Sequence, residues 1–135
     1  MLDIYHSFRI TPAIHPIAMT TANANGIGVD LEGYRSALIS VSLGASGALL
    51  GASNLVTLQF YESTDNSTWT APADTDLIGG NNVAVIDANA EANTVVQRGY
   101  IGAKRYVTVT ANPTGEIALP ISAVVVRGFP LTSIA

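Results

Sequence analysis

The chain has 135 residues, which suits one domain of ordinary size, and it contains no cysteine, so disulfides and cysteine-ligated metal sites are excluded. Charged residues make up only 12% of the chain and hydrophobic residues 48%, with a net charge of −4. This balance excludes a disordered tail and argues against a nucleic-acid partner, because disorder needs more charge and nucleic-acid binding needs a basic surplus.

Apolar residues recur mostly at every second position, a spacing that predicts β-strands with one buried face. Glycine, asparagine and serine clusters separate these runs, and no segment shows the 3.6-residue period of a helix. Many short strands of this kind predict an all-β fold, either an antiparallel β-sandwich or a jelly roll. Within the last run, Pro120 lacks a backbone donor and favours an edge strand or a bulge. In chain order, the predicted strands cover residues 13–19, 28–31, 36–43, 55–62, 83–86, 94–101, 105–111 and 117–126.

The first 25 residues are predicted to form an extended N-terminal arm in front of a β-sandwich domain of residues 26–135. Pro12 and Pro16 favour extended backbone at the residues that precede them. The segment lacks the apolar core of a signal peptide. The longest apolar run, residues 117–126, is about half the ~20 residues of a spanning helix. We therefore expect no membrane partner.

Charge is distributed unevenly along the chain. Residues 36–97 contain no lysine or arginine but six carboxylates, whereas Arg98, Lys104, Arg105 and Arg127 follow against a single carboxylate. Two interpretations are open. The charges are solvated and neutralise one another across the fold, or an acidic and a basic surface meet between neighbouring molecules.

The sequence lacks the spacings that catalysis or metal binding requires. His6 and His15 have no closely spaced second ligand, and no G-x-S-x-G nucleophile motif is present. Residues 87–98 begin like a calcium loop but carry Ala92 and Arg98 where that loop needs glycine and glutamate. We expect no enzyme activity and no cofactor.

Trp69 leaves one further alternative open. An exposed tryptophan on a β-sandwich stacks on sugar rings, because an amphipathic ring suits a wet interface. A single tryptophan after a hairpin turn is more often a core or lid residue.

Three segments together resemble small structural proteins of tailed phage particles. The first reads V-D-L-E-G-Y-R-S-A-L over residues 29–38, and the second reads F-Y-E-S-T-D-N-S-T-W-T over residues 60–70. The third reads G-Y-I-G-A-K-R-Y-V-T-V over residues 99–109, and V-R-G-F-P closes the pattern at residues 126–130. The resemblance covers roughly residues 29–130 and leaves the N-terminal arm outside it.

Structural roles for residues in these segments follow from their chemistry. Asp65 and the asparagine after it suit left-handed turn positions, and Trp69 is expected to fold back onto the sheet. Gly99 and Gly102 permit a bulge or tight bend. Arg105 is expected to pair with Asp30 or Asp65 and to pin one sheet edge. Gly33, in the first segment, completes the set of structural candidates.

The resemblance implies a β-sandwich protein of the virion, specifically a decoration (cement) protein on the capsid exterior, made in the host cytoplasm. Such proteins bind the major capsid protein as homo-oligomers, often trimers, without chemistry. A tail or baseplate component, or a carbohydrate-binding module for host adhesion, is the alternative. The arm and the basic residues are the partner-binding candidates, namely His6, Phe8, Arg9, His15, Arg98, Lys104 and Arg127.

Overall fold

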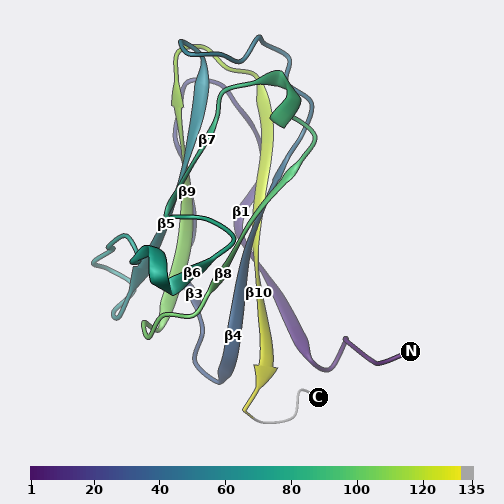
Figure 1. The fold of residues 1–135 in the computed structure, drawn as a ribbon, viewed down its shortest axis with the longest axis vertical. Helices are drawn as coiled ribbons and strands as arrows, with labels where there is room; N and C mark the ends of the chain where they lie inside the picture. The colour runs from purple at the N-terminus through teal and green to yellow at the C-terminus, as the bar shows by residue number, and fades with distance from the viewer. Residues whose placement is uncertain (132–135) are drawn as a thin grey trace.

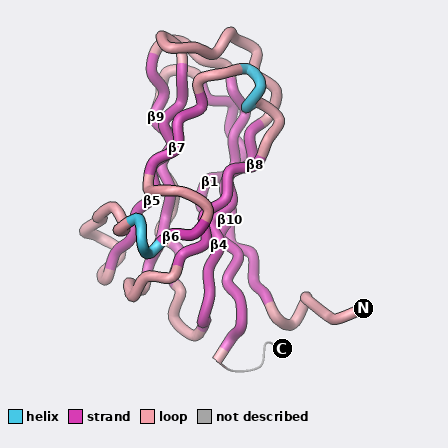
Figure 2. Tube along the Cα trace, viewed as in Figure 1, coloured by secondary structure: helices cyan, strands magenta, loops and turns pink. Residues whose placement is uncertain are grey.

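The computed structural model describes residues 1–131 of the chain, which form ten strands and two short 3-10 helices (Figures 1 and 2). No helix in this part of the chain is long and apolar enough to span a membrane. The elements are β1 (Phe8–Met19), β2 (Ala24–Asn25), β3 (Val29–Asp30), β4 (Tyr34–Leu43), β5 (Leu55–Ser63), η1 (Asp74–Asp76), β6 (Leu77–Ile78), β7 (Val83–Ile86), η2 (Asn89–Glu91), β8 (Val95–Tyr100), β9 (Tyr106–Thr114) and β10 (Leu119–Pro130).

The strands form two antiparallel sheets that face each other. Sheet A has the order β1-β10-β4-β8-β6, and sheet B has the order β2-β9-β5-β7, with β3 also paired to β9. When β6 is set aside and β2 and β3 are treated as one interrupted strand, each sheet alternates strands from the first and second halves of the chain. This is the strand order of a jelly roll. The predicted all-β sandwich is confirmed.

The core lies between the sheets and follows directly from the alternation of side chains along each strand. In β4 the buried residues are Ala37, Ile39, Val41 and Leu43, and the residues that alternate with them face outward. Phe60 of β5 is fully buried at the centre of the opposite sheet. Burial of one face of each strand is therefore the main source of stability.

The two ends of the sandwich differ in what they carry. Both termini of the described chain lie at one end, together with the turn at residues 31–33 and the loop at residues 101–105 (Figure 1). We call this the terminal end. The distal end carries the loops at residues 44–54, 87–94 and 115–118.

The predicted position of Pro120 at an edge strand is wrong. β10 lies between β1 and β4, so it is an interior strand. Pro120 is tolerated because it lies at the start of β10, beyond the last residue that pairs with β4, while its carbonyl still accepts a hydrogen bond from the Gly44 N–H. The register irregularities lie in the partner strand, on either side of Ile14 of β1.

The segment expected to form an arm is largely a strand of the sandwich. β1 pairs with β10 from Phe8 to Met19, and Ala13, Ile14 and Met19 are buried in the core. The physical reason is that β10 would otherwise expose a long unpaired edge. Residues 1–7 precede the first strand and extend away from the sandwich in Figure 1.

Candidate interaction surfaces

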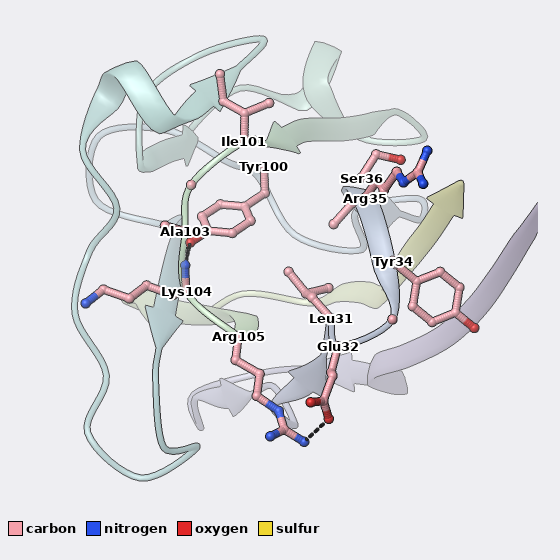
Figure 3. Close-up of a pocket in the computed structure, with 13 residues that line it drawn as sticks. Leu31, Glu32, Tyr34, Arg35, Ser36, Tyr100, Ile101, Ala103, Lys104 and Arg105 are labelled. Carbon is pink, nitrogen blue, oxygen red and sulfur yellow. Dashed lines mark hydrogen bonds and ion pairs between the residues drawn. The ribbon is translucent and has the colours of Figure 1, made fainter. Parts of the chain in front are cut away.

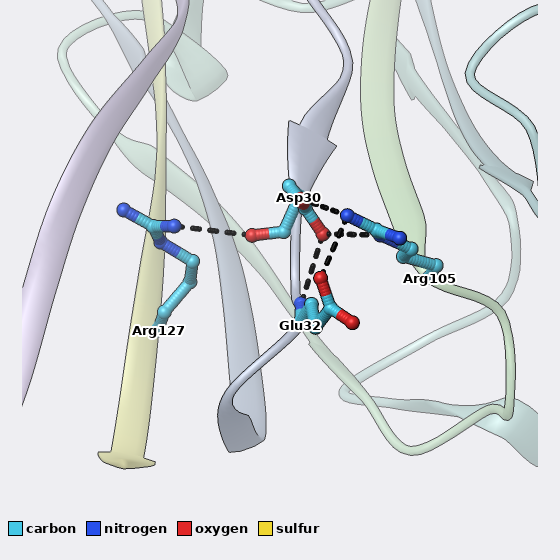
Figure 4. Close-up of polar contacts among 4 residues, drawn as sticks. All are labelled: Asp30, Glu32, Arg105 and Arg127. Carbon is cyan, nitrogen blue, oxygen red and sulfur yellow. Dashed lines mark hydrogen bonds and ion pairs between the residues drawn. The ribbon is translucent and has the colours of Figure 1, made fainter. Parts of the chain in front are cut away.

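An ion-pair cluster joins the two loops of the terminal end (Figure 4). Arg105 donates to both carboxylate oxygens of Asp30, at 2.9 and 2.8 Å, and contacts the Glu32 carboxylate at 2.7 Å. The hydrogen bonds from Arg105 lower the pKa of Asp30, and the same contact raises the pKa of Arg105. Of the two partners expected for Arg105, the structure selects Asp30. The cluster fixes the end of β3 against the start of β9.

Arg127 of β10 adds a third element to this cluster. Its guanidinium donates to the Asp30 carbonyl oxygen at 3.1 Å and to the Thr11 hydroxyl at 2.7 Å, and it lies 4.7 Å from the centre of the Tyr34 ring. Its Nε is buried without a hydrogen-bond partner in the described part of the chain. Arg127 therefore connects β10 to β1 and β3 within one molecule, rather than presenting its charge to a partner.

A cleft of about 490 Å³ opens beside this cluster, between residues 31–37 and 100–105 (Figure 3). On one side lies Tyr100, whose hydroxyl donates to the buried Glu62 carboxylate at 2.6 Å and accepts the Lys104 N–H at 3.0 Å. Burial, with the nearby carboxylate, raises the pKa of Tyr100. The Lys104 side chain is exposed. The Tyr100–Glu62 pair joins the two sheets and holds this loop in place, which is a structural role.

The loop after β5 is organised by Asp65. Its carboxylate accepts the backbone N–H of Ser67 and Thr68 and the Ser63 hydroxyl, at 2.8 to 2.9 Å. These hydrogen bonds lower the pKa of Asp65 to about 2. The next residue, Asn66, has a φ of 59°, so the left-handed turn is confirmed at Asn66.

The Trp69 ring lies against Gly28, in the loop between β2 and β3. A Cβ atom added at Gly28 would lie 2.8 Å from the indole ring, so the ring lies against the backbone there. The side chain is half-buried. This position favours the lid interpretation over an open sugar-stacking platform.

The candidates in the N-terminal segment and on β1 lie at or near the surface. The His6 ring contacts the Asp3 carboxylate at 2.5 Å, and the Phe8 and Phe129 rings meet edge-on with centroids 5.8 Å apart. Arg9 lies 5.7 Å from the centre of the Tyr5 ring. Farther along β1, His15 is exposed. His6 and Arg9 thus lie beside the same ring, that of Tyr5.

Arg98 faces the interior of the sandwich. Its guanidinium lies 5.3 Å from the centre of the buried Phe60 ring, and its Nε donates to the Asn81 carbonyl at 2.9 Å. Burial lowers the pKa of Arg98. The arginine therefore covers the open side of the core between β8 and β7.

The glycines proposed as structural residues differ in their constraints. Gly33 has a φ of 88°, which the turn into β4 requires and which other residues rarely adopt. A Cβ at Gly102 would lie 2.5 Å from the Tyr100 hydroxyl, so the loop needs a glycine to pass over that ring. At Gly99 a Cβ would meet Ile78 at 3.4 Å, an ordinary contact distance.

The acidic stretch of the sequence does not form one surface. Glu62 is buried, whereas Asp65, Asp74 and Asp76 lie toward the terminal end. The remaining two carboxylates, Asp87 and Glu91, lie at the distal end, where no described loop carries a lysine or arginine. Arg98, Arg105 and Arg127 contact groups within the molecule, so the described residues of these two stretches do not separate into one acidic and one basic face.

The outward faces of both sheets are almost free of charge, but they differ in polarity. Alternation and register assign the outward positions. Sequence reasoning missed this difference, because the period of two assigns residues to faces but not to sheets. Outward residues of sheet A include Ile10, Pro12, Leu38, Ser40, Ser42, Ile78, Val95, Gln97, Gly99, Ser122, Val124 and Val126; those of sheet B include Asn25, Asp30, Leu55, Thr57, Gln59, Tyr61, Val83, Val85, Thr108, Thr110, Asn112 and Thr114.

The described residues contain no group of three or more side chains that could hold a metal ion. The polar clusters described above tie loops and strands together. The Ser63–Asp65 and Tyr100–Glu62 hydrogen bonds are examples of this structural use.

Comparison with known proteins finds similarity in fold alone. No family model matches the sequence, and no curated protein matches it. Among solved structures, the SPBc2 prophage-derived protein YomS is similar over 93% of this chain and 98% of its own, with 14% identity and a TM-score of 0.54. A chain in the capsid structure of Helicobacter pylori bacteriophage KHP30 is similar over 96% of this chain and 93% of its own, with 15% identity and a TM-score of 0.50.

A third similarity is to the PBSX exported protein XepA, with 15% identity and a TM-score of 0.56. It covers 94% of this chain but only 39% of XepA, so this fold corresponds to one part of that longer protein. At such low identities, these similarities establish a shared fold.

Proposed function

We propose that this chain is a non-enzymatic structural protein of a tailed phage particle, a decoration protein that binds the major capsid protein on the capsid exterior. It does so as a homo-oligomer, a trimer, and it is made in the host cytoplasm. The observation that carries the proposal is a jelly roll whose two broad faces carry almost no charge. The cores of protein interfaces are depleted of charged residues, so such faces suit a molecule covered by neighbours.

The similarity to a chain of a phage capsid structure and to a prophage-derived protein supports the proposal. The described polar groups support a role without chemistry. Asp30, Arg105 and Arg127 are occupied in holding strands together, and Glu62 is occupied by Tyr100.

The test uses particles of the phage that encodes this sequence, separated into heads and tails and analysed by quantitative mass spectrometry. We expect the protein in the head fraction, at a fixed ratio to the major capsid protein. Antibody labelling of intact heads then reports whether it lies on the exterior. Recovery from tails only would replace the capsid role with a tail or baseplate role, and absence from the particle would contradict the proposal.

A further inference from the structure

The outward face of sheet A carries an apolar band that crosses all five strands. The register aligns Ile10 of β1, Val126 of β10, Leu38 of β4, Gly99 of β8 and Ile78 of β6 in one row. Gly99 has no side chain, and the Ile78 side chain lies beside this position. A Cβ atom added at Gly99 would lie 3.4 Å from the Cβ atom of Ile78. The band is therefore continuous from one edge of the sheet to the other.

The ends of this band are strongly exposed. Ile10 is 67% exposed and Ile78 is 59% exposed. Next to Ile10, the terminal end adds further exposed apolar side chains at Ile4, Phe129 and Leu131. Phe129 has a φ of 51°, a backbone conformation that bulky residues rarely adopt. Connected exposed apolar surfaces of this kind mark interaction sites on many proteins.

The size of the face fits a protein partner. Strands of about ten residues at ~3.3 Å per residue, four strands wide at ~4.8 Å, give a flat area of roughly 600 Å². A stable interface covers about 800 Å² on each partner. The exposed apolar residues of the terminal end adjoin the face and extend it toward that size.

We infer that a second copy of this chain covers the outward face of sheet A. The charge distribution favours a second copy, because every copy carries a net charge of −4, and like charges must be kept apart when copies meet. None of the outward residues of the described strands in sheet A is charged. The outward face of sheet B carries one charged residue, Asp30 of β3, which pairs with Arg105. Threonine, asparagine and glutamine dominate the rest of that face, and these groups hydrogen-bond to water.

The inference rests on the proposed function for the homo-oligomer and names the surface that forms it. Its test needs the purified chain alone, without capsids, so its failure is distinct from absence of the protein from the particle. A segment of the same chain or an unrelated protein are the other candidate occupants, and either would leave the purified chain monomeric.

The experiment measures the solution mass of the full chain by light scattering over a range of concentrations. We expect a multiple of the chain mass of 14.0 kDa, three times that value for a trimer. Leu38→Glu at the centre of the band places a charge in the contact and should reduce the mass to that of the monomer. Ile78→Glu, at an exposed edge position, should weaken association at least tenfold without disturbing the fold.

The matched control is Thr110→Glu, at an outward position of an interior strand of sheet B. It should leave the mass unchanged. Circular dichroism of every variant reports folding, and Ile78→Glu keeps the test valid if Leu38→Glu does not fold. A monomeric wild type at all concentrations overturns the inference. Retained association in Ile78→Glu, or dissociation by Thr110→Glu alone, would overturn it as well.

Discussion

The outward faces of the two sheets both carry very few charged residues, but sheet A is apolar at its centre and sheet B is polar there. Sheet A presents Ile10, Leu38 and Val126 in one row, whereas the corresponding centre of sheet B presents Gln59 paired with Thr110. Both sets contain β-branched residues, Ile10 and Val126 in sheet A and Thr110 in sheet B, which pack well on the pleated backbone of a strand. The difference therefore lies in what the side chains do outside the sheet, and not in whether the sheet forms.

This comparison locates the charge deficit of the sequence. Charged residues are confined largely to loops and strand ends, where Asp30, Glu32 and Arg105 hold one another. A face rich in threonine and amide groups remains compatible with water, whereas an apolar row does not. The low charge content therefore has different consequences on the two faces: the face of sheet B remains compatible with water, and the apolar row of sheet A does not.

The largest expected effect comes from removing the strand that borders sheet A. Deletion of residues 1–19 removes β1, with the buried Ala13, Ile14 and Met19, and exposes the edge of β10. Each buried side chain of this size contributes on the order of 1–3 kcal/mol, so we expect loss of cooperative urea unfolding. Deletion of residues 1–7 is the control and should leave the unfolding midpoint nearly unchanged. Equal midpoints for both deletions would show that sheet A does not depend on β1.

A smaller effect is expected from giving sheet B the character of sheet A. The triple change Thr57→Val, Gln59→Leu and Thr110→Val makes one apolar patch on neighbouring outward positions. Surface changes of this kind alter stability by about 0.5 kcal/mol or less. Light scattering should nevertheless detect additional association at high concentration. The pair Thr57→Ser and Thr110→Ser serves as the control, and an unchanged mass in the triple variant would break the proposed link between polarity and association.

The smallest effect concerns Asp65, which lies on neither face. Its folded pKa of about 2 is below the ordinary 3.8, so its carboxylate stabilises the fold above about pH 3.8. That contribution is lost as the pH falls from 3.8 toward 2. Compared with Asp65→Ala, wild-type protein should have a slightly higher thermal midpoint at neutral pH, and the difference should close near pH 2. A difference that stays constant across this range would contradict the role given to the carboxylate.

The strands themselves could be predicted from the sequence because one buried face leaves a period of two. All eight predicted strands contain or overlap an observed strand, and residues 83–86 match β7 at both ends. The two-residue strands β2 and β6 escaped prediction, since two residues cannot show an alternation. The arm was predicted from Pro12 and Pro16, but both prolines lie within an edge strand, where a missing donor is tolerated.

The interaction surfaces were less accessible to prediction. For Arg105, sequence analysis named two acidic candidates, and one of them is the observed partner. For Arg127 it named none, because its partners are a backbone carbonyl and a hydroxyl that lie 97 and 116 residues away in the sequence. The band on sheet A depends on the register of five strands at once. No local pattern in the sequence contains that information.

The position of β10 also has a consequence for how sheet A folds. β10 lies in the interior of the sheet and pairs with β1 on one side and with β4 on the other, although both precede it by a long stretch of chain. β1 and β4 therefore lack their shared neighbour until the distant β10 has paired with both. Such pairing between distant segments is slow, on the order of milliseconds to seconds. Until it is complete, the unpaired edges of β1 and β4 are exposed to aggregation.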